Sequence, residues 1–309
     1  METLAKPRMS PVFVLGVGIL AVSMGSILAR LAQEEHVPSL VIAAYRTAVA
    51  ALVLLPLLLA RHRQEVRTLG LADWRLALLS GLLLAVHFAT WISSLAYTSV
   101  ASSTVLVSTS PLWVALAAPF LLNEPFTRPL KIGMTLALVG SVVISLGGSV
   151  VWVDGRLVLG AMMGGERPLL GNALALIGAV AGAGYLLIGR KLRVRLSLIG
   201  YITLVYSTAA LGLIAVVYLT GGSMFGYSSK AYWMVLLMGL GPQLLGHSSF
   251  NYALAYLPAA IVGATTFAEP IGASILALLI FSEMPGPLVV LGGVFVFAGL
   301  LVAGRRAAA

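Results

Sequence analysis

The chain has 309 residues, of which 60% are hydrophobic and only 9% are charged, and its mean hydropathy is +1.04. Soluble domains carry about 25% charged residues, so this composition excludes a soluble globular protein and predicts an integral membrane protein. Cysteine is absent, which excludes disulfides, thiolate nucleophiles and cysteine-ligated metals.

The net charge of +9 raises the question of nucleic-acid binding. The basic residues, however, form short blocks between apolar runs and do not line one amphipathic face, a pattern that indicates membrane topology and no nucleic-acid partner. The first apolar run, from about residue 11 to residue 29, lacks a cleavage site followed by a polar mature chain. We therefore expect it to be a membrane helix.

Apolar runs long enough to cross a hydrocarbon core of about 30 Å recur along the whole chain. In chain order they cover about 11–31, 39–60, 75–97, 100–122, 129–148, 168–189, 197–219, 231–253, 259–281 and 285–304. The sequence therefore predicts an all-α integral membrane protein with ten transmembrane helices.

The positions of Lys and Arg predict how these helices are oriented. If the amino terminus is cytoplasmic, the outer segments contain only Arg30, Arg156, Arg167 and Lys230, and Arg46 is the one basic residue inside a span. The positive-inside rule then places both termini in the cytoplasm of a multi-pass protein of the cell (inner or plasma) membrane.

The two halves of the sequence match each other. A shift of 159 positions aligns Trp74 with Trp233, Pro111 with Pro270, Glu124 with Glu283, Gly133 with Gly292 and Gly140 with Gly299, and a shift of 160 aligns Gly18 with Gly178 and Arg30 with Arg190. Five spans, an odd number, make the second half enter the membrane from the opposite side. We therefore expect two inverted five-helix repeats around a central cavity, at 1–148 and 168–309, joined by a linker at 149–167.

Several short runs also carry a family resemblance. They are His87 to Trp91, Leu95 to Ser103, Ser110-Pro111-Leu112-Trp113 and Asn123-Glu124-Pro125 in the first half, and Gly246-His247, Asn251 to Leu254, Glu269 to Gly272 and Glu283 in the second. Over nearly its full length the chain resembles EamA-like transporters of the drug/metabolite transporter (DMT) superfamily. The resemblance implies a secondary active transporter working by alternating access, mostly in efflux of metabolites, amino acids or drug-like solutes, and it implies no single substrate.

Glu269 is the leading candidate for a substrate- or proton-binding residue, because an ionised side chain in mid-span costs at least a few kcal/mol. Pro270 removes an amide and disturbs the bond to the carbonyl of Thr266, so we expect a kinked, polar patch. The aligned position in the first half is Ser110, before the second expected kink at Pro111. One interpretation is a cavity carboxylate that binds a cationic group or a proton in alternation with substrate, and the other is a structural Glu that is protonated or paired.

Arg46 lies about eight residues inside the second span. Three roles stay open for it: contact with a substrate carboxylate, pairing with Glu269, or snorkelling of the side chain to the interface. The aligned residue in the second half is Tyr206, and both helices are expected to face the cavity.

The eighth span carries Gln243, His247 and Asn251 at intervals of four, which puts them on one face of an α-helix. His87, with Trp91 one turn later, lies at nearly the same depth in the third span. The histidines could relay protons, since the ordinary pKa of histidine is about 6.5, or they could make structural hydrogen bonds between helices. No carboxylate triad accompanies them, so no metal site is predicted.

Nothing in the sequence predicts an enzyme or a cofactor, because no GxSxG, HExxH or paired catalytic aspartates occur. The alternative to a transporter is a passive facilitator or channel, which would conduct without saturation. The expected partners are a small-molecule solute, the lipid bilayer and protons as coupling ion. A monomer is sufficient because one chain supplies both repeats, and a homodimer is compatible with the small-residue surfaces of the helices.

Overall fold

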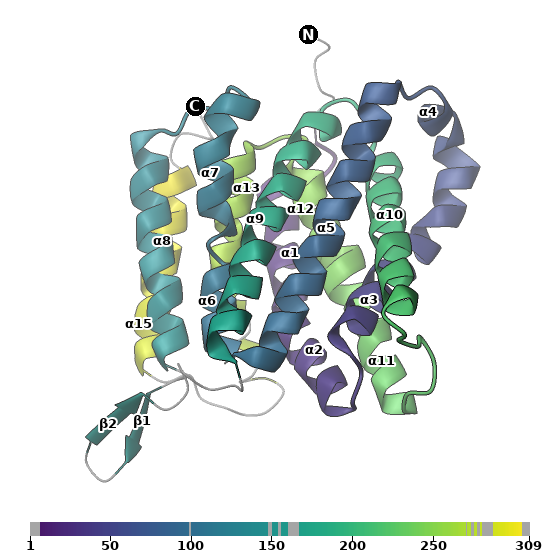
Figure 1. Ribbon diagram of the computed structural model, residues 1–309. Helices are drawn as coiled ribbons and strands as arrows, with labels where there is room; N and C mark the ends of the chain where they lie inside the picture. Colours follow the sequence, from purple (N-terminus) through teal and green to yellow (C-terminus); the bar gives the residue numbers. More distant parts are fainter. Residues whose placement is uncertain are drawn as a thin grey trace.

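The computed structural model describes residues 7–98, 100–147, 150–153, 156–159, 167–269, 271–272, 275–276, 279 and 287–304. These residues form a bundle of helices with one small hairpin at its edge (Figure 1). Five helical stretches are long and apolar enough to cross a membrane, namely Pro11–Glu34, Ser39–Arg67, Leu71–Tyr97, Pro168–Arg193 and Leu198–Leu219. The prediction of an α-helical membrane protein is confirmed.

Each predicted span coincides with one or more helices of the structure. For the ninth span, the structure describes only some of the residues after Glu269. The first half contains α1 (Pro11–Ser23), α2 (Gly25–Glu34), α3 (Ser39–Leu57), π-helical η1 (Leu58–His62), α4 (Arg63–Arg67), α5 (Leu71–Tyr97), α6 (Val100–Val107), α7 (Ser110–Leu121) and α8 (Arg128–Gly147). The second half contains α9 (Pro168–Arg193), α10 (Leu198–Leu219), α11 (Ser229–Met238), π-helical η2 (Gly239–His247), α12 (Ser248–Ala253), α13 (Ala259–Ala264), 3₁₀-helical η3 (Thr265–Ala268) and α15 (Pro287–Gly304).

Two of the predicted spans are interrupted. The fourth ends as α6 at Val107 and resumes as α7 at Ser110, because Pro111 lacks an N–H and its ring clashes with the carbonyl four residues earlier, which is that of Val107. The ninth passes from α13 into η3 directly before Glu269. The expected kink at Pro270 lies outside the described residues.

The segment at 149–167, which we expected to be a linker, contains two antiparallel strands, β1 (Val150–Val153) and β2 (Arg156–Leu159). Its sequence explains them, because β-branched residues flank Asp154-Gly155, and Asp-Gly between apolar runs is a strong hairpin signal. The prediction of an all-α chain is therefore incomplete at this point.

The connections between helices gather at two opposite ends of the bundle (Figure 1). At one end, shown uppermost, Arg195 pairs with Asp73 at 2.8 Å and Glu65 accepts a hydrogen bond from the Ser197 amide at 2.6 Å. At the hairpin end, Glu35 accepts hydrogen bonds from Lys230 and Ser228 at 2.8 and 2.7 Å, and these bonds lower the pKa of Glu35. The contacts at each end join the two halves.

Helices α8 and α15 approach each other most closely at glycines. A Cβ atom placed on Gly133 would lie 2.5 Å from the carbonyl oxygen of Gly299, and one on Gly140 would lie 2.5 Å from that of Gly292. No ordinary side chain fits at such distances. Close backbone contact of this kind is how helices associate in lipid, where the hydrophobic effect does not drive them together.

We predict that Gly140→Ala lowers the melting temperature of the purified protein by several degrees. Alanine is the better helix former by about 1 kcal/mol, but its methyl group would displace the backbone of α15. The matched control is Gly16→Ala in α1, where a Cβ meets nothing within 4 Å and the melting temperature should hold or rise. Thermal melting in detergent compares the two variants, and equal melting temperatures would contradict the packing argument.

Candidate functional site

A cavity lies in the middle of the bundle, between helices of both halves. Seven of the candidate residues line it: Arg46, His87, Trp91, Ser110, His247, Thr266 and Glu269. The cavity has a volume of about 70 Å³, several times the roughly 10–15 Å³ that one water molecule needs. The fold therefore brings together polar residues that are up to about 220 positions apart in the sequence.

Two helix interruptions, one in each half, place polar side chains at this cavity. Ser108 and Ser110 stand at the break between α6 and α7, and Thr266 and Glu269 stand in and directly after η3. Irregular backbone inside a membrane is tolerated where it is buried in protein or lines a cavity. The break before Pro111 therefore also positions Ser108 and Ser110 at the cavity.

Arg46, from α3, is buried to 1% exposure, so it does not snorkel. Its Nε donates a hydrogen bond to Oε1 of Gln243 at 3.1 Å. The centre of its guanidinium lies 3.7 Å from the ring centroid of Phe88 and 5.9 Å from that of Trp91. A cation over an aromatic face at this distance is stabilised by the ring quadrupole, so Phe88 and Gln243 fix the orientation of the guanidinium.

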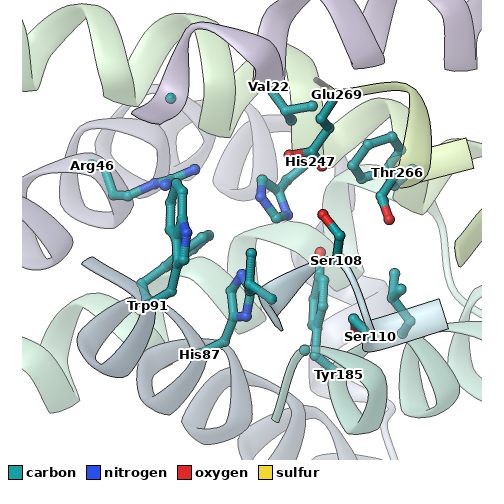
Figure 2. Close-up of a pocket in the computed structure, with 16 residues that line it drawn as sticks. Val22, Arg46, His87, Trp91, Ser108, Ser110, Tyr185, His247, Thr266 and Glu269 are labelled. Atoms are coloured by element: carbon teal, nitrogen blue, oxygen red, sulfur yellow. The ribbon is translucent and has the colours of Figure 1, made fainter. Parts of the chain in front are cut away.

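Glu269 lines the same cavity, and in Figure 2 the ring of His247 lies between it and Arg46. The backbone carbonyl of Glu269 accepts a hydrogen bond from Ser23 Oγ at 3.0 Å, which ties this residue to α1. Within the described part of the chain, no ion pair joins Glu269 to Arg46. An acidic and a basic side chain thus line one cavity without a direct ion pair between them.

The two histidines differ in their bonding. Nδ1 of His87 lies 2.8 Å from the carbonyl oxygen of Gly178, which fits a structural hydrogen bond between α5 and α9, and its ring stacks on Trp91. His247 packs edge-on against Phe88 at 5.1 Å, and its Nδ1 has no partner among the described residues. Nδ1 of His247 is therefore left for a ligand, whereas Nδ1 of His87 is engaged with the protein.

Three candidates lie beside the cavity and do not line it: Gln243, Asn251 and Tyr206. All are completely buried. Gln243 holds Arg46, Asn251 donates hydrogen bonds to the Tyr185 hydroxyl and to the His247 carbonyl, and Tyr206 shares a hydrogen bond of 3.2 Å with Ser248. These residues position the lining side chains.

The prediction of a regular α-helix over the eighth span is wrong for the central part of that span. Residues Gly239–His247 form a π-helix that contains Pro242. π-Helical segments are rare and occur frequently at functional sites. In this wider turn Gln243 still faces α3 and His247 faces the cavity. Both polar side chains therefore lie inside the bundle, although the helix is not an α-helix here.

The sequence did not identify the aromatic wall of the cavity, formed by Phe88, Tyr185 and Phe250. The 25 aromatic residues of the chain look alike in sequence, since lipid-facing and cavity-facing aromatics share the same neighbours. A signal was available for Phe88 alone, which sits next to His87. Tyr185 follows the small residues Gly182 and Gly184 and could not be separated from a packing residue.

Glu124 lies away from the cavity, at the end of α7, where Asn123 adopts the left-handed conformation with φ 55°. Its carboxylate accepts a hydrogen bond from Arg190 Nε at 2.7 Å and another from the Ala259 amide at 2.8 Å. These bonds tie Glu124 to α9 and to the start of α13. It joins the first half to the second at this end.

Comparison with known proteins identifies the family to which the chain is similar. Residues 9–146 and 169–305 each match the model of the EamA-like transporter family. The chain is 25% identical over 259 residues to an uncharacterised transporter of Clostridium kluyveri, covering 82% of this chain and 79% of the relative. It is 28% identical over 209 residues to the uncharacterised transporter YetK of Bacillus subtilis, covering 65% of this chain and 60% of the relative. One solved crystal structure has the same fold, with a TM-score of 0.77 at 18% identity over 97% of this chain and 98% of that one.

We predict that Gly182→Ala lowers the solute transport rate at least several-fold per folded molecule. A Cβ at this cavity-lining position would lie 2.9 Å from Nδ1 of His87 and 3.4 Å from Oγ of Ser110, so it would displace the histidine into the cavity. Gly212→Ala in α10 is the control, because its Cβ would make an ordinary contact of 3.7 Å with Leu82. Uptake into proteoliposomes measures both, and equal rates would show that solute does not pass this point.

Proposed function

This chain belongs to the EamA-like transporter family, and from that premise we propose that it is a secondary active transporter that exports a small organic solute by alternating access. We further propose that Glu269 couples solute movement to protons. The observation that carries the proposal is that a carboxylate and a guanidinium from opposite halves line one mid-bundle cavity without forming an ion pair with each other. Ionisable residues at membrane depth are costly and characteristically mark transport pathways.

Glycine contacts support inverted repeats at 1–148 and 168–309, with 149–167 as connection. Gly133 aligns with Gly292 and Gly140 with Gly299 in the sequence, yet in space Gly133 meets Gly299 and Gly140 meets Gly292. Exchanging the halves turns one contact into the other, as a two-fold axis between antiparallel helices requires. Such an axis is the architecture on which alternating access is commonly built.

A second pair of contacts supports the same axis. A Cβ on Gly18 would approach the Gly246 carbonyl at 3.2 Å, and one on Gly178 would approach the His87 carbonyl at 3.3 Å. Gly18 aligns with Gly178, and His87 with Gly246. The contact of α1 with η2 therefore corresponds to the contact of α9 with α5.

The distribution of basic residues supports cytoplasmic termini in a cell membrane. The end of the bundle that carries Arg61, Arg63, Arg67, Arg193 and Arg195 is the end opposite the hairpin, and the positive-inside rule assigns that end to the cytoplasm. Both repeats lie in one chain, so a monomer is the proposed working unit. The outward direction is proposed from the efflux role that the family resemblance implies.

The coupling step follows from competition at one carboxylate. Ionised Glu269 attracts either a proton or the cationic group of a solute, such as the amine of an amino acid, and it cannot hold both. Release of one therefore accompanies binding of the other, and a proton gradient drives the solute when each form of the carrier crosses between its two open states. The pseudo-symmetric position carries Ser110, so the cavity has this carboxylate on one side only.

We predict that Glu269→Gln abolishes transport driven by a pH gradient, with a loss of at least tenfold, while the protein remains folded. Glutamine keeps the shape and the hydrogen-bonding capacity of the side chain but carries no titratable charge. The solute for this assay is chosen by thermal-shift screening of the purified protein against amino acids, nucleosides, organic acids and cationic drugs, since a ligand that binds the native state raises its melting temperature. Flux is then measured in proteoliposomes with an imposed pH gradient.

The matched control for this prediction is Glu34→Gln, because the side chain of Glu34 is 60% exposed and lies 3.9 Å from Arg30 at the surface. It should transport like the unmodified protein. Gradient-driven flux that survives in Glu269→Gln would overturn the coupling role of this residue. Flux that does not saturate with solute concentration would instead favour a passive facilitator.

A further inference from the structure

Arg46 uses few of its hydrogen-bond donors within the protein. A guanidinium has five N–H groups, and in the described structure only Nε donates to an acceptor, Oε1 of Gln243. Nη1 is buried and has no acceptor among the described residues. Because Phe88 covers one face of the guanidinium and Gln243 holds its Nε, the two Nη groups are left for a ligand.

Trp91 and Gln243 add further donors at the same place. Nε1 of Trp91 and Nε2 of Gln243 are both buried, and neither has an acceptor in the part of the chain that the structure describes. The amide orientation of Gln243 is dictated by Arg46, since Arg46 can only donate and the amide must turn its oxygen toward it. Figure 2 shows Trp91 directly beside the guanidinium of Arg46.

Buried donors are nearly always paired in folded proteins, so a cluster of unpaired donors calls for an acceptor from outside the chain. An acceptor that matches a guanidinium fork is a carboxylate, which accepts two parallel hydrogen bonds from it. Glu269 does not serve, because it forms no ion pair with Arg46. The aromatic rings of Phe88 and Phe250 line the adjoining space, which suits an apolar body attached to the acid.

We propose that Arg46 and Trp91 form a carboxylate-binding subsite, oriented by Gln243 as a positioning residue, and that the solute of this transporter carries a carboxylate on an apolar, ring-sized body in addition to the cationic group proposed for Glu269. This inference rests on the proposed transport function and extends it to the class of solute. The subsite lies apart from Glu269, so the acid group and the coupling carboxylate occupy different parts of one cavity.

The test compares benzoate and benzamide as probes of the purified full-length protein by titration calorimetry in detergent. The two share one ring and a planar head group, and they differ in the charge of that group. Benzoate is expected to bind at least tenfold more tightly than benzamide. Equal or tighter binding of benzamide overturns the proposal without any variant being made.

Variants then locate the site. Trp91→Phe keeps the ring and removes one donor, so it should weaken benzoate about tenfold and leave benzamide unchanged, while Trp233→Phe, at a position 62% exposed, should change neither. Gln243→Leu should weaken benzoate, and Gln33→Leu, which removes a glutamine bonded to Ser39 and the Ile92 carbonyl, should not. Benzoate binding that is indifferent to Trp91→Phe overturns the subsite even if Arg46 variants fail to fold.

Glu269→Gln separates this inference from the proposed coupling. It removes a negative charge from the cavity, so it should bind benzoate at least as tightly as the unmodified protein while losing gradient-driven transport. If Glu269→Gln loses gradient-driven transport but the unmodified protein does not bind benzoate, the coupling role of Glu269 stands and the carboxylate subsite is rejected. If the unmodified protein binds benzoate selectively but Glu269→Gln keeps gradient-driven transport, the subsite stands and the coupling role is rejected.

Discussion

Helices inside lipid gain nothing by hiding apolar side chains from one another, because the lipid tails are equally apolar. The bundle therefore depends on close approach of backbones, and each close approach needs a glycine. Gly178 lies against the carbonyl of His87, and α8 meets α15 at Gly133 and Gly140. Large apolar side chains are left to face the lipid, as Phe120 is at 86% exposure. These glycines therefore hold the two halves of the bundle together.

Polar groups enter this bundle where its helices cannot stay regular. In the interior of a membrane, backbone that leaves the α-helix must be buried in protein or face a cavity, so each interruption determines where the cavity lies. The break after Val107, the 3₁₀ turn before Glu269 and the π-helix that ends at His247 all border the same space. Glycine packing thus joins the two halves, and the helix interruptions place the polar residues of the site between them.

Much of this organisation is readable from sequence because its causes are local or periodic. Hydropathy predicts the spans, and Pro111 predicts a kink in the fourth, because its ring clashes with the carbonyl of Val107, four residues earlier. The π-helix around Pro242 could not be predicted, since it depends on how that segment packs against α1 and α3. Tyr185 was missed for a related reason, because an aromatic residue has the same sequence context whether it faces lipid or a cavity.

Arg46 and Glu269 line the same cavity but are held apart by the residues around them. A buried ion pair in direct contact would leave each charge satisfied by the other, and breaking it would cost several kcal/mol. Here Phe88 and Gln243 hold the guanidinium, while η3 and the Ser23 hydrogen bond hold the carboxylate residue on the other side of His247. Each charge is thereby kept available to a ligand group of opposite sign. In the proposed transport cycle, a solute and a proton supply the missing partners, and occupancy of the site is thereby coupled to movement of the two halves.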